Sequence, residues 1–205
     1  MTYNYFYNHW HHLACFSTAQ VRAIYPDFHR GNYLQWQKVG YIVPLRQGWY
    51  AFADYANKPD YARYFASKIY TPSYISLHTA LSFYGIIPEA VVAITSITTR
   101  KTAQFDNVFA SYSYQTIKPS LFWGYEPKQL SDGKTYMLAT PEKALIDLLY
   151  LYPQYSTEEE MRELRLDEDF MQNELDKKSL LEYTNRIGSP ILTKRVKLML
   201  KTYAL

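Results

Sequence analysis

Residues 32–52 have the sequence NYLQWQKVGYIVPLRQGWYAF, in which a helical stretch is followed by a glycine and then by a short hairpin. The mixed aromatic and polar pattern predicts a helix from about Arg30 to Val39. Gly40 supplies the left-handed residue that commonly ends a helix. Residues 41–52 alternate strand-forming side chains around a turn and therefore predict a β-hairpin. Pro44 lacks a backbone donor, which confines its strand to a sheet edge.

Two further helices are predicted before this stretch. The first carries apolar residues at helical spacing, namely Tyr3, Phe6, Tyr7, Trp10, Leu13 and Ala14. On this interpretation Cys15 is a small buried residue of a helix. The second helix begins at Ser17, where Gln20 completes a capping box, and it ends before Pro26.

Three helices followed by a short hairpin are typical of a winged helix-turn-helix, which we expect over residues 1–56. In that arrangement the third helix enters the major groove of DNA, with Leu34, Tyr33 and Trp36 pointing inward. The side chains left free are types that bind base edges or phosphates, and we expect DNA contacts from Arg30, Asn32, Gln35, Lys38, Arg46 and Gln47. An ordinary polar helix face has the same composition, and some winged helices bind only protein.

Residues 60–205 predict a larger mixed α/β domain, and residues 57–60 (NKPD) predict the linker that precedes it. The overall fold class is therefore α+β, with a small sheet and C-terminal helices in the second domain. Helices are expected over 61–70, from Ser73 or Ser76 to Phe83, and over 157–164, 178–186 and 193–201. Strands are expected over 91–99, 111–117, 121–125 and 135–139, with a turn at 131–133.

A further helix is predicted after residue 139. Thr140 is a suitable N-cap, Pro141 suits the first helical position, and Glu142 places an acid at the positive end of the helix dipole. Ala144, Leu145, Leu148, Leu149 and Tyr152 form its apolar stripe. Lys143 and Asp147 are one turn apart, which predicts an ion pair on the surface.

Charge is unevenly distributed although the net charge is only +3. Residues 1–58 hold five basic and two acidic side chains, and residues 186–205 hold five basic and no acidic ones. Residues 156–185 hold ten acidic and four basic ones, which is typical of solvated helix faces. No apolar run is long enough to cross a bilayer, and residues 1–12 lack the pattern of a secretory signal, so we expect a cytoplasmic protein without membrane contact.

No catalytic, metal or cofactor motif is present. The seven glycines form no phosphate-binding loop, and there is no Gly-x-Ser-x-Gly elbow. His9 and His12 lie one turn apart but lack further ligands. His11 and His12 lie near Cys15 in sequence but face away from the apolar stripe. We therefore expect neither an enzyme nor a cofactor.

Five segments together resemble the AbiEi family of type IV antitoxins, which are bacterial regulators from abortive-infection and toxin–antitoxin operons that act in phage defence. The N-terminal match is NYLQWQKVGYIVPLRQGWYAF (residues 32–52). The matches in the second domain are YISLHTALSFYGIIPEAV (74–91), ITSITTRKTAQF (94–105), YQTIKPSLFWGY (114–125) and ATPEKALIDLLY (139–150). The resemblance covers nearly the whole chain, and its order and spacing are specific.

The resemblance implies a transcriptional repressor that binds promoter DNA of its own operon and counteracts a nucleotidyltransferase-like toxin, with or without a stable complex. It implies that the second domain carries neutralisation. The polar residues of the matching motifs that suit a partner surface are Arg100, Lys101, Lys118, Glu142 and Lys143. Glu142 and Lys143 have a second interpretation, in which they only begin and solubilise their helix.

Two other classes of function remain open from the sequence. One is a protein-interaction module whose winged helix no longer binds DNA. The other is a nucleic-acid-modifying enzyme acting through the second domain, for which the sequence offers no site. The N-terminal domain is also less basic than expected for a tight DNA binder, which predicts modest affinity.

Overall fold

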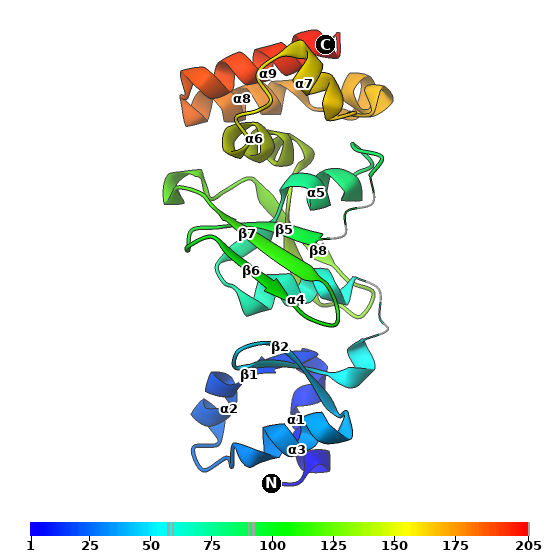
Figure 1. The fold of residues 1–205 in the computed structure, drawn as a ribbon, viewed down its shortest axis with the longest axis vertical. Helices are drawn as coiled ribbons and strands as arrows, with labels where there is room; N and C mark the ends of the chain where they lie inside the picture. Colours follow the sequence, from blue (N-terminus) through cyan, green and yellow to red (C-terminus); the bar gives the residue numbers. More distant parts are fainter. Residues whose placement is uncertain (57, 59, 90, 92, 205) are drawn as a thin grey trace.

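The computed structural model describes residues 1–56, 58, 60–89, 91 and 93–204. The chain folds into three successive layers along one long axis (Figure 1). A small N-terminal unit, residues 1–56, lies at one end and a six-stranded sheet lies in the middle. Helices cover the other end, so the two termini lie far apart. The fold is mixed α+β, as predicted.

The N-terminal unit consists of three helices and a three-stranded antiparallel sheet. Its helices are α1 (Tyr3–Trp10), α2 (Thr18–Ile24) and α3 (Gly31–Val39), with a short 3-10 turn η1 (His11–Leu13) after α1. Its strands are β1 (Cys15–Ser17), β2 (Ile42–Arg46) and β3 (Trp49–Phe52), in the order β1-β3-β2. Strand β2 is therefore at an edge, which accommodates Pro44.

Local capping sets the boundaries of α2 and α3. Ser17 and Gln20 form the predicted capping box at the start of α2. Gly40 ends α3 with φ of 80°, as predicted. The prediction that Cys15 lies in a helix is wrong, because Cys15 pairs with Ala51 in strand β1. Cys15 is nevertheless buried.

Aromatic rings fill the core of the N-terminal unit. The ring of Phe6 lies 4.9 Å from those of Phe16 and Trp36, measured between centroids. Tyr33 and Trp36 hold α3 against this core and are 5% and 4% exposed. Leu34, which was also predicted to point inward, is 66% exposed, so that prediction is wrong.

The six-stranded sheet has the order β6-β7-β5-β4-β9-β8. Its strands are β4 (Ser73–Ile75), β5 (Ala93–Thr98), β6 (Ala103–Asp106), β7 (Ser111–Thr116), β8 (Tyr125–Gln129) and β9 (Thr135–Ala139). Strands β5, β7 and β9 match predictions, although Val92 of the first predicted strand is outside the described residues. Strands β4, β6 and β8 were not predicted. The strand expected over 121–125 is wrong, because a 3-10 turn η3 (Pro119–Leu121) precedes β8.

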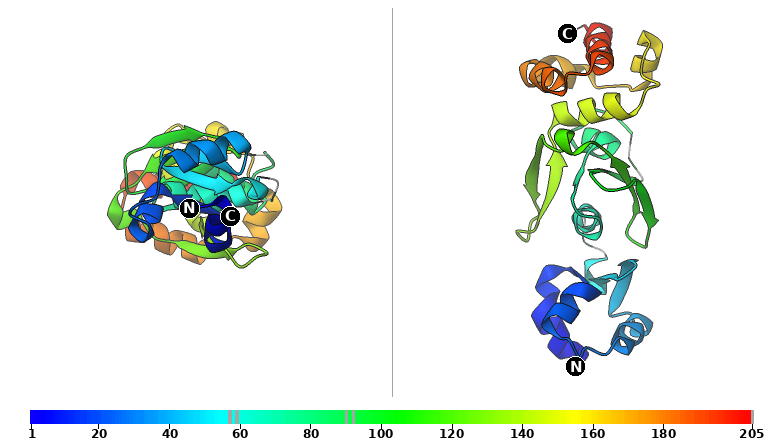
Figure 2. Two further views of the ribbon diagram at one scale, coloured as in Figure 1. Left: turned by 90° about the horizontal axis from the view of Figure 1, so that it is seen from below. Right: turned by 90° about the vertical axis from the view of Figure 1, so that its left-hand side faces the viewer.

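Helices α4 (Tyr61–Ile69) and α5 (Leu77–Phe83) accompany this sheet, and a short 3-10 turn η2 (Ala53–Tyr55) precedes α4. Figure 2 shows the sheet bent around them, with α4 toward the N-terminal unit. The predicted linker lies between η2 and α4. Asn57 and Pro59 of that linker are outside the described residues.

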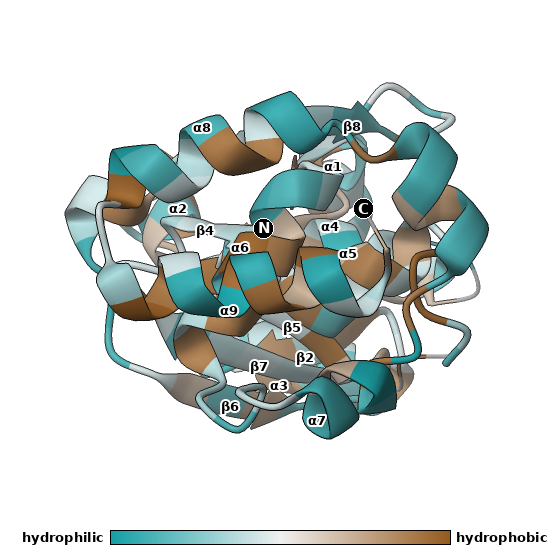
Figure 3. Ribbon diagram, turned by 90° about the horizontal axis from the view of Figure 1, so that it is seen from above, coloured by the Kyte–Doolittle hydropathy of each residue, from teal (hydrophilic) through white to brown (hydrophobic). Residues whose placement is uncertain are grey.

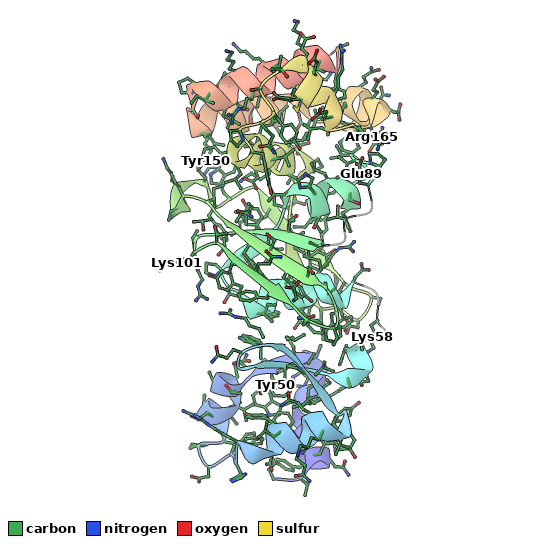
Figure 4. All side chains as sticks on the ribbon, viewed as in Figure 1. Tyr50, Lys58, Glu89, Lys101, Tyr150 and Arg165 are labelled. Carbon is green, nitrogen blue, oxygen red and sulfur yellow. The ribbon has the colours of Figure 1, made fainter. Side chains whose placement is uncertain are left out.

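The third layer is helical and packs on α6 (Pro141–Leu151). It comprises α7 (Glu158–Glu163), a single wide turn η4 (Phe170–Glu174), α8 (Lys177–Ile187) and α9 (Pro190–Thr202). Hydrophilic and hydrophobic residues alternate along α8 and α9, which is typical of amphipathic helices lying on a core (Figure 3). Arg165 donates to Glu89 at 2.9 Å and joins this layer to the segment that follows α5 (Figure 4).

No helix in the described parts of the chain is both long enough and apolar enough to span a bilayer.

Candidate nucleic-acid interface

The exposed face of α3 is the first candidate surface for nucleic acid. Leu34, Gln35 and Lys38 are exposed there, on the side opposite the buried Tyr33 and Trp36. Helix α3 contains no acidic residue. Of the other residues predicted on it, Arg30 is exposed at the N-cap and Asn32 is half-buried at the margin. The face therefore presents an amide, a cation and an apolar side chain together.

Helix α2 extends this surface on one side. Thr18, Arg22 and Arg30 line a shallow depression of about 550 Å³ between α2 and the start of α3. Within the described residues, Arg22, Arg30 and Lys38 form no ion pair. Three uncompensated cations around one helix are suited to phosphate oxygens.

The tip of the β2–β3 hairpin borders the same surface. The backbone N–H of Thr18 donates to the carbonyl of Gly48 at 2.8 Å, which places the tip beside the start of α2. Gln47 is exposed at this tip. Of the two hairpin residues predicted to contact DNA, Arg46 and Gln47, Gln47 is the one exposed at the edge of the α2–α3 surface.

Arg46 is in a different environment from the one predicted. Its guanidinium donates to the carbonyl of Ile69 at 2.7 Å, and its central carbon lies 4.4 Å from the ring centroid of Phe105 and 5.0 Å from that of Tyr70. A planar guanidinium commonly stacks on aromatic rings in this way. Arg46 therefore holds the hairpin to the second unit, residues 60–204, and is not a free side chain at a wing tip.

Two further hydrogen bonds join the N-terminal unit to the second unit. The side-chain amide of Asn107 donates to the carbonyl of Leu45 at 2.9 Å, and the hydroxyl of Tyr64 donates to the carbonyl of Leu13 at 3.2 Å. Because these contacts use β2 and the end of η1, helix α3 lies on the side away from the second unit (Figure 1). The exposed face of α3 is consequently open to solvent.

Three cations of the predicted partner surface gather at one end of the larger sheet. Arg100 and Lys101 follow β5, and Lys118 follows β7, which runs parallel to β5. All three are exposed. The hydroxyl of Tyr70 donates to the backbone carbonyl of Lys101 at 2.7 Å and so fixes the backbone at this end of the sheet. Lys101 projects away from the sheet (Figure 4).

The other two predicted partner residues, Glu142 and Lys143, are buried in α6. The prediction that Lys143 and Asp147 pair on the surface is wrong, since both side chains are 0% exposed although they do pair. Tyr74 and Ser76 on and beside β4 complete the network, donating to Asp147 at 2.9 and 2.8 Å. The ammonium of Lys143 also donates to the Tyr74 hydroxyl at 2.8 Å.

Burial shifts both groups of this pair toward their neutral forms. Desolvation lowers the pKa of Lys143 and raises that of Asp147, because each charge loses its hydration. The mutual attraction of the pair opposes both shifts, and the hydrogen bonds from Tyr74 and Ser76 also stabilise the carboxylate. Glu142 is 8% exposed and accepts a hydrogen bond from the backbone of Asp176. These residues hold α6 in place and present nothing to a partner.

Cys15 does not resemble a nucleophile. Its side chain is buried, and burial raises the pKa of the thiol to about 12. The thiol therefore stays protonated near neutral pH. Among the residues with described positions, no three His, Cys, Asp or Glu side chains converge as metal ligands would.

Sequence reasoning missed two residues of the candidate surface. The sequence predicts that Leu34 points inward, because periodicity over nine residues does not separate it reliably from the buried Tyr33 and Trp36. Arg22 was not singled out, because nothing local indicates that α2 brings it beside Arg30.

The chain matches no known protein-family model, and no curated protein sequence is significantly similar to it.

Proposed function

We propose that this protein is a DNA-binding regulator that uses the exposed face of α3 as its recognition surface. The observation that carries the proposal is the combination of free Gln35 and Lys38 on a helix without acidic residues, turned away from the second unit. The element order α1-β1-α2-α3-β2-β3 and the sheet order β1-β3-β2 support a winged helix-turn-helix for the N-terminal unit.

DNA contact in this proposal depends on α2 and α3 more than on the hairpin. Arg46 is engaged with Tyr70 and Phe105, which leaves Gln47 as the hairpin's contribution. Arg22, Arg30 and Lys38 contact phosphates. The side-chain amide of Gln35 offers a donor and an acceptor to a base edge. Few phosphate contacts predict moderate affinity with a shallow dependence on salt.

The biological role that we propose is that of an AbiEi-like type IV antitoxin, which represses its own operon and counteracts a nucleotidyltransferase-like toxin. The five sequence segments that resemble this family support this role. The exposed cluster Arg100, Lys101 and Lys118 is the surface that we assign to neutralisation, since it is basic and lies on the second unit. Glu142 and Lys143 are left out of that surface because they are buried.

Two substitutions on α3 separate base recognition from phosphate contact. Gln35→Ala is expected to weaken binding to DNA upstream of the protein's own gene by about 1–3 kcal/mol and to leave binding to shuffled DNA nearly unchanged. Lys38→Ala is expected to weaken both equally and to reduce the salt slope by about one. Fluorescence anisotropy titrations with full-length protein measure both effects.

Two control variants accompany this experiment. Lys197→Ala removes one positive charge from the exposed face of α9 and is expected to change neither affinity nor slope. Arg46→Ala is expected to keep DNA affinity, because the side chain faces the second unit. If Gln35→Ala and Lys38→Ala both bind like the unmodified protein, α3 is not the recognition helix.

A protein-interaction module is the second candidate function. It is favoured by large apolar side chains exposed on the N-terminal unit, with Ile24 62%, Leu34 66% and Val39 56% exposed. Such side chains can serve a protein partner as well as a base edge. Equal affinity for upstream and shuffled DNA would favour this candidate.

A further inference from the structure

The position of Leu34 is unusual for a leucine. It lies in the middle of α3, and two-thirds of its side chain is exposed although Tyr33 and Trp36 beside it are buried. The side chain therefore adds nothing to the core of the N-terminal unit. An exposed leucine is common on protein surfaces, so exposure alone assigns no role to it.

The neighbours of Leu34 on the helix surface are more informative. Arg30 lies one turn before it and Lys38 one turn after it, so the row along α3 is basic, apolar and basic. Cations at both ends of such a row can reach phosphates on either side of a groove. The residue between them is then held against the groove floor, where base edges are exposed.

Gly31 lies beside the His29 ring at the start of α3. It lies one turn before Leu34 and carries no side chain that would cover it. A Cβ built at Gly31 would come within 2.8 and 2.9 Å of the His29 ring, so a larger residue fits there only if that ring moves. The His29 ring therefore occupies the space beside Gly31, one turn before Leu34.

We infer that Leu34 contacts the 5-methyl group of a thymine in the major groove and makes that thymine a determinant of the recognised sequence. The thymine methyl is the apolar group that base pairs present in this groove. Gln35, the next residue, can accept and donate at an adjacent adenine edge. This inference rests on the proposed function of α3, and it adds a specificity determinant that the polar side chains do not provide.

Deoxyuridine tests the contact directly, because it differs from thymine only by the missing methyl group. Each thymine of the bound upstream fragment is replaced in turn, and affinities are measured for the full-length protein and for Leu34→Ala. For the unmodified protein, replacement of one particular thymine is expected to lower the affinity about fourfold, which corresponds to the loss of one buried methyl group. Leu34→Ala is expected to bind more weakly overall and to show no further loss at that position.

A second readout distinguishes a lost contact from a damaged helix. Leu34→Ala is expected to keep the salt slope and the melting temperature of the unmodified protein, because the phosphate contacts and the core remain.

The outcomes separate this inference from the proposed function. Sequence-specific binding that is insensitive to every thymine methyl overturns the role of Leu34 and leaves the DNA-binding proposal standing. A sensitive thymine that stays equally sensitive in Leu34→Ala also overturns it, since another residue then makes the contact. Absence of any sequence preference overturns the proposed function and this inference together.

Discussion

Asp147→Ala is expected to lower the free energy of unfolding by about 3–5 kcal/mol, because it leaves the Lys143 ammonium buried without its counter-charge. Both side chains are fully buried, and Tyr74 and Ser76 lose their acceptor at the same time. Urea denaturation followed by circular dichroism measures the effect. The same network joins α6 to β4, so the loss is expected for the second unit.

An exposed pair of the same spacing provides the matched control. Lys178 and Glu182 are also one helical turn apart, at 3.9 Å, but their side chains are 85% and 63% exposed. Glu182→Ala is therefore expected to change stability by less than about 0.5 kcal/mol. A double substitution, Lys143→Met with Asp147→Leu, is expected to recover much of the loss, since no unpaired charge remains buried. A loss below about 1 kcal/mol for Asp147→Ala would contradict the buried ion pair.

Trp36→Ala is expected to destabilise the N-terminal unit by about 3–5 kcal/mol, through the cavity that a deleted core aromatic leaves. The Trp36 ring packs against Phe6 at 4.9 Å, Tyr3 at 5.4 Å and Phe28 at 5.6 Å between centroids. Because Trp36 holds α3 in place, this variant is also expected to lose DNA binding although the polar face is unchanged. Thermal denaturation and the DNA titration give the two measurements.

Leu34→Ala, in the same helix, is the control for the Trp36→Ala prediction. Leu34 is two residues away but exposed, so its truncation is expected to change stability by less than about 0.5 kcal/mol. If Leu34→Ala destabilised the protein as much as Trp36→Ala, the orientation of α3 described above would be incorrect.

The elements that sequence predicts well are those set by neighbouring residues. Ser17 with Gln20, Gly40, and Thr140 with Pro141 begin or end helices as expected, because a cap is satisfied within one turn of chain. The hairpin at 42–52 is equally local, since a two-residue turn and two strands form it.

The elements that were missed depend on distant partners. Strand β1 has three residues and exists because it pairs with β3, more than 30 positions later. Strand β4 is equally short and lies between β5 and β9. A three-residue stretch has too few residues to show alternation, so its partners decide its conformation.

The sequence indicated some of the polar residues that the structure leaves exposed, but not which of them the rest of the chain covers. The spacing of Lys143 and Asp147 correctly indicated a pair, but Tyr74 on β4, which hydrogen-bonds to both, is about 70 residues away. Arg46 was likewise expected to be free beside Gln47 at the hairpin tip, but it contacts the second unit while Gln47 stays exposed. Burial of this kind results from the packing of whole units, so it cannot be predicted from neighbouring residues in the sequence.

The affinity of the full-length protein for DNA upstream of its own gene, compared with shuffled DNA of equal length across a salt series, tests the proposed function most directly. We expect a preference of about 10³-fold or more for the upstream DNA. We also expect a non-specific salt slope near −3 per bound chain, from the three cations Arg22, Arg30 and Lys38. Equal affinity for the two DNAs at every salt concentration would contradict the proposed function.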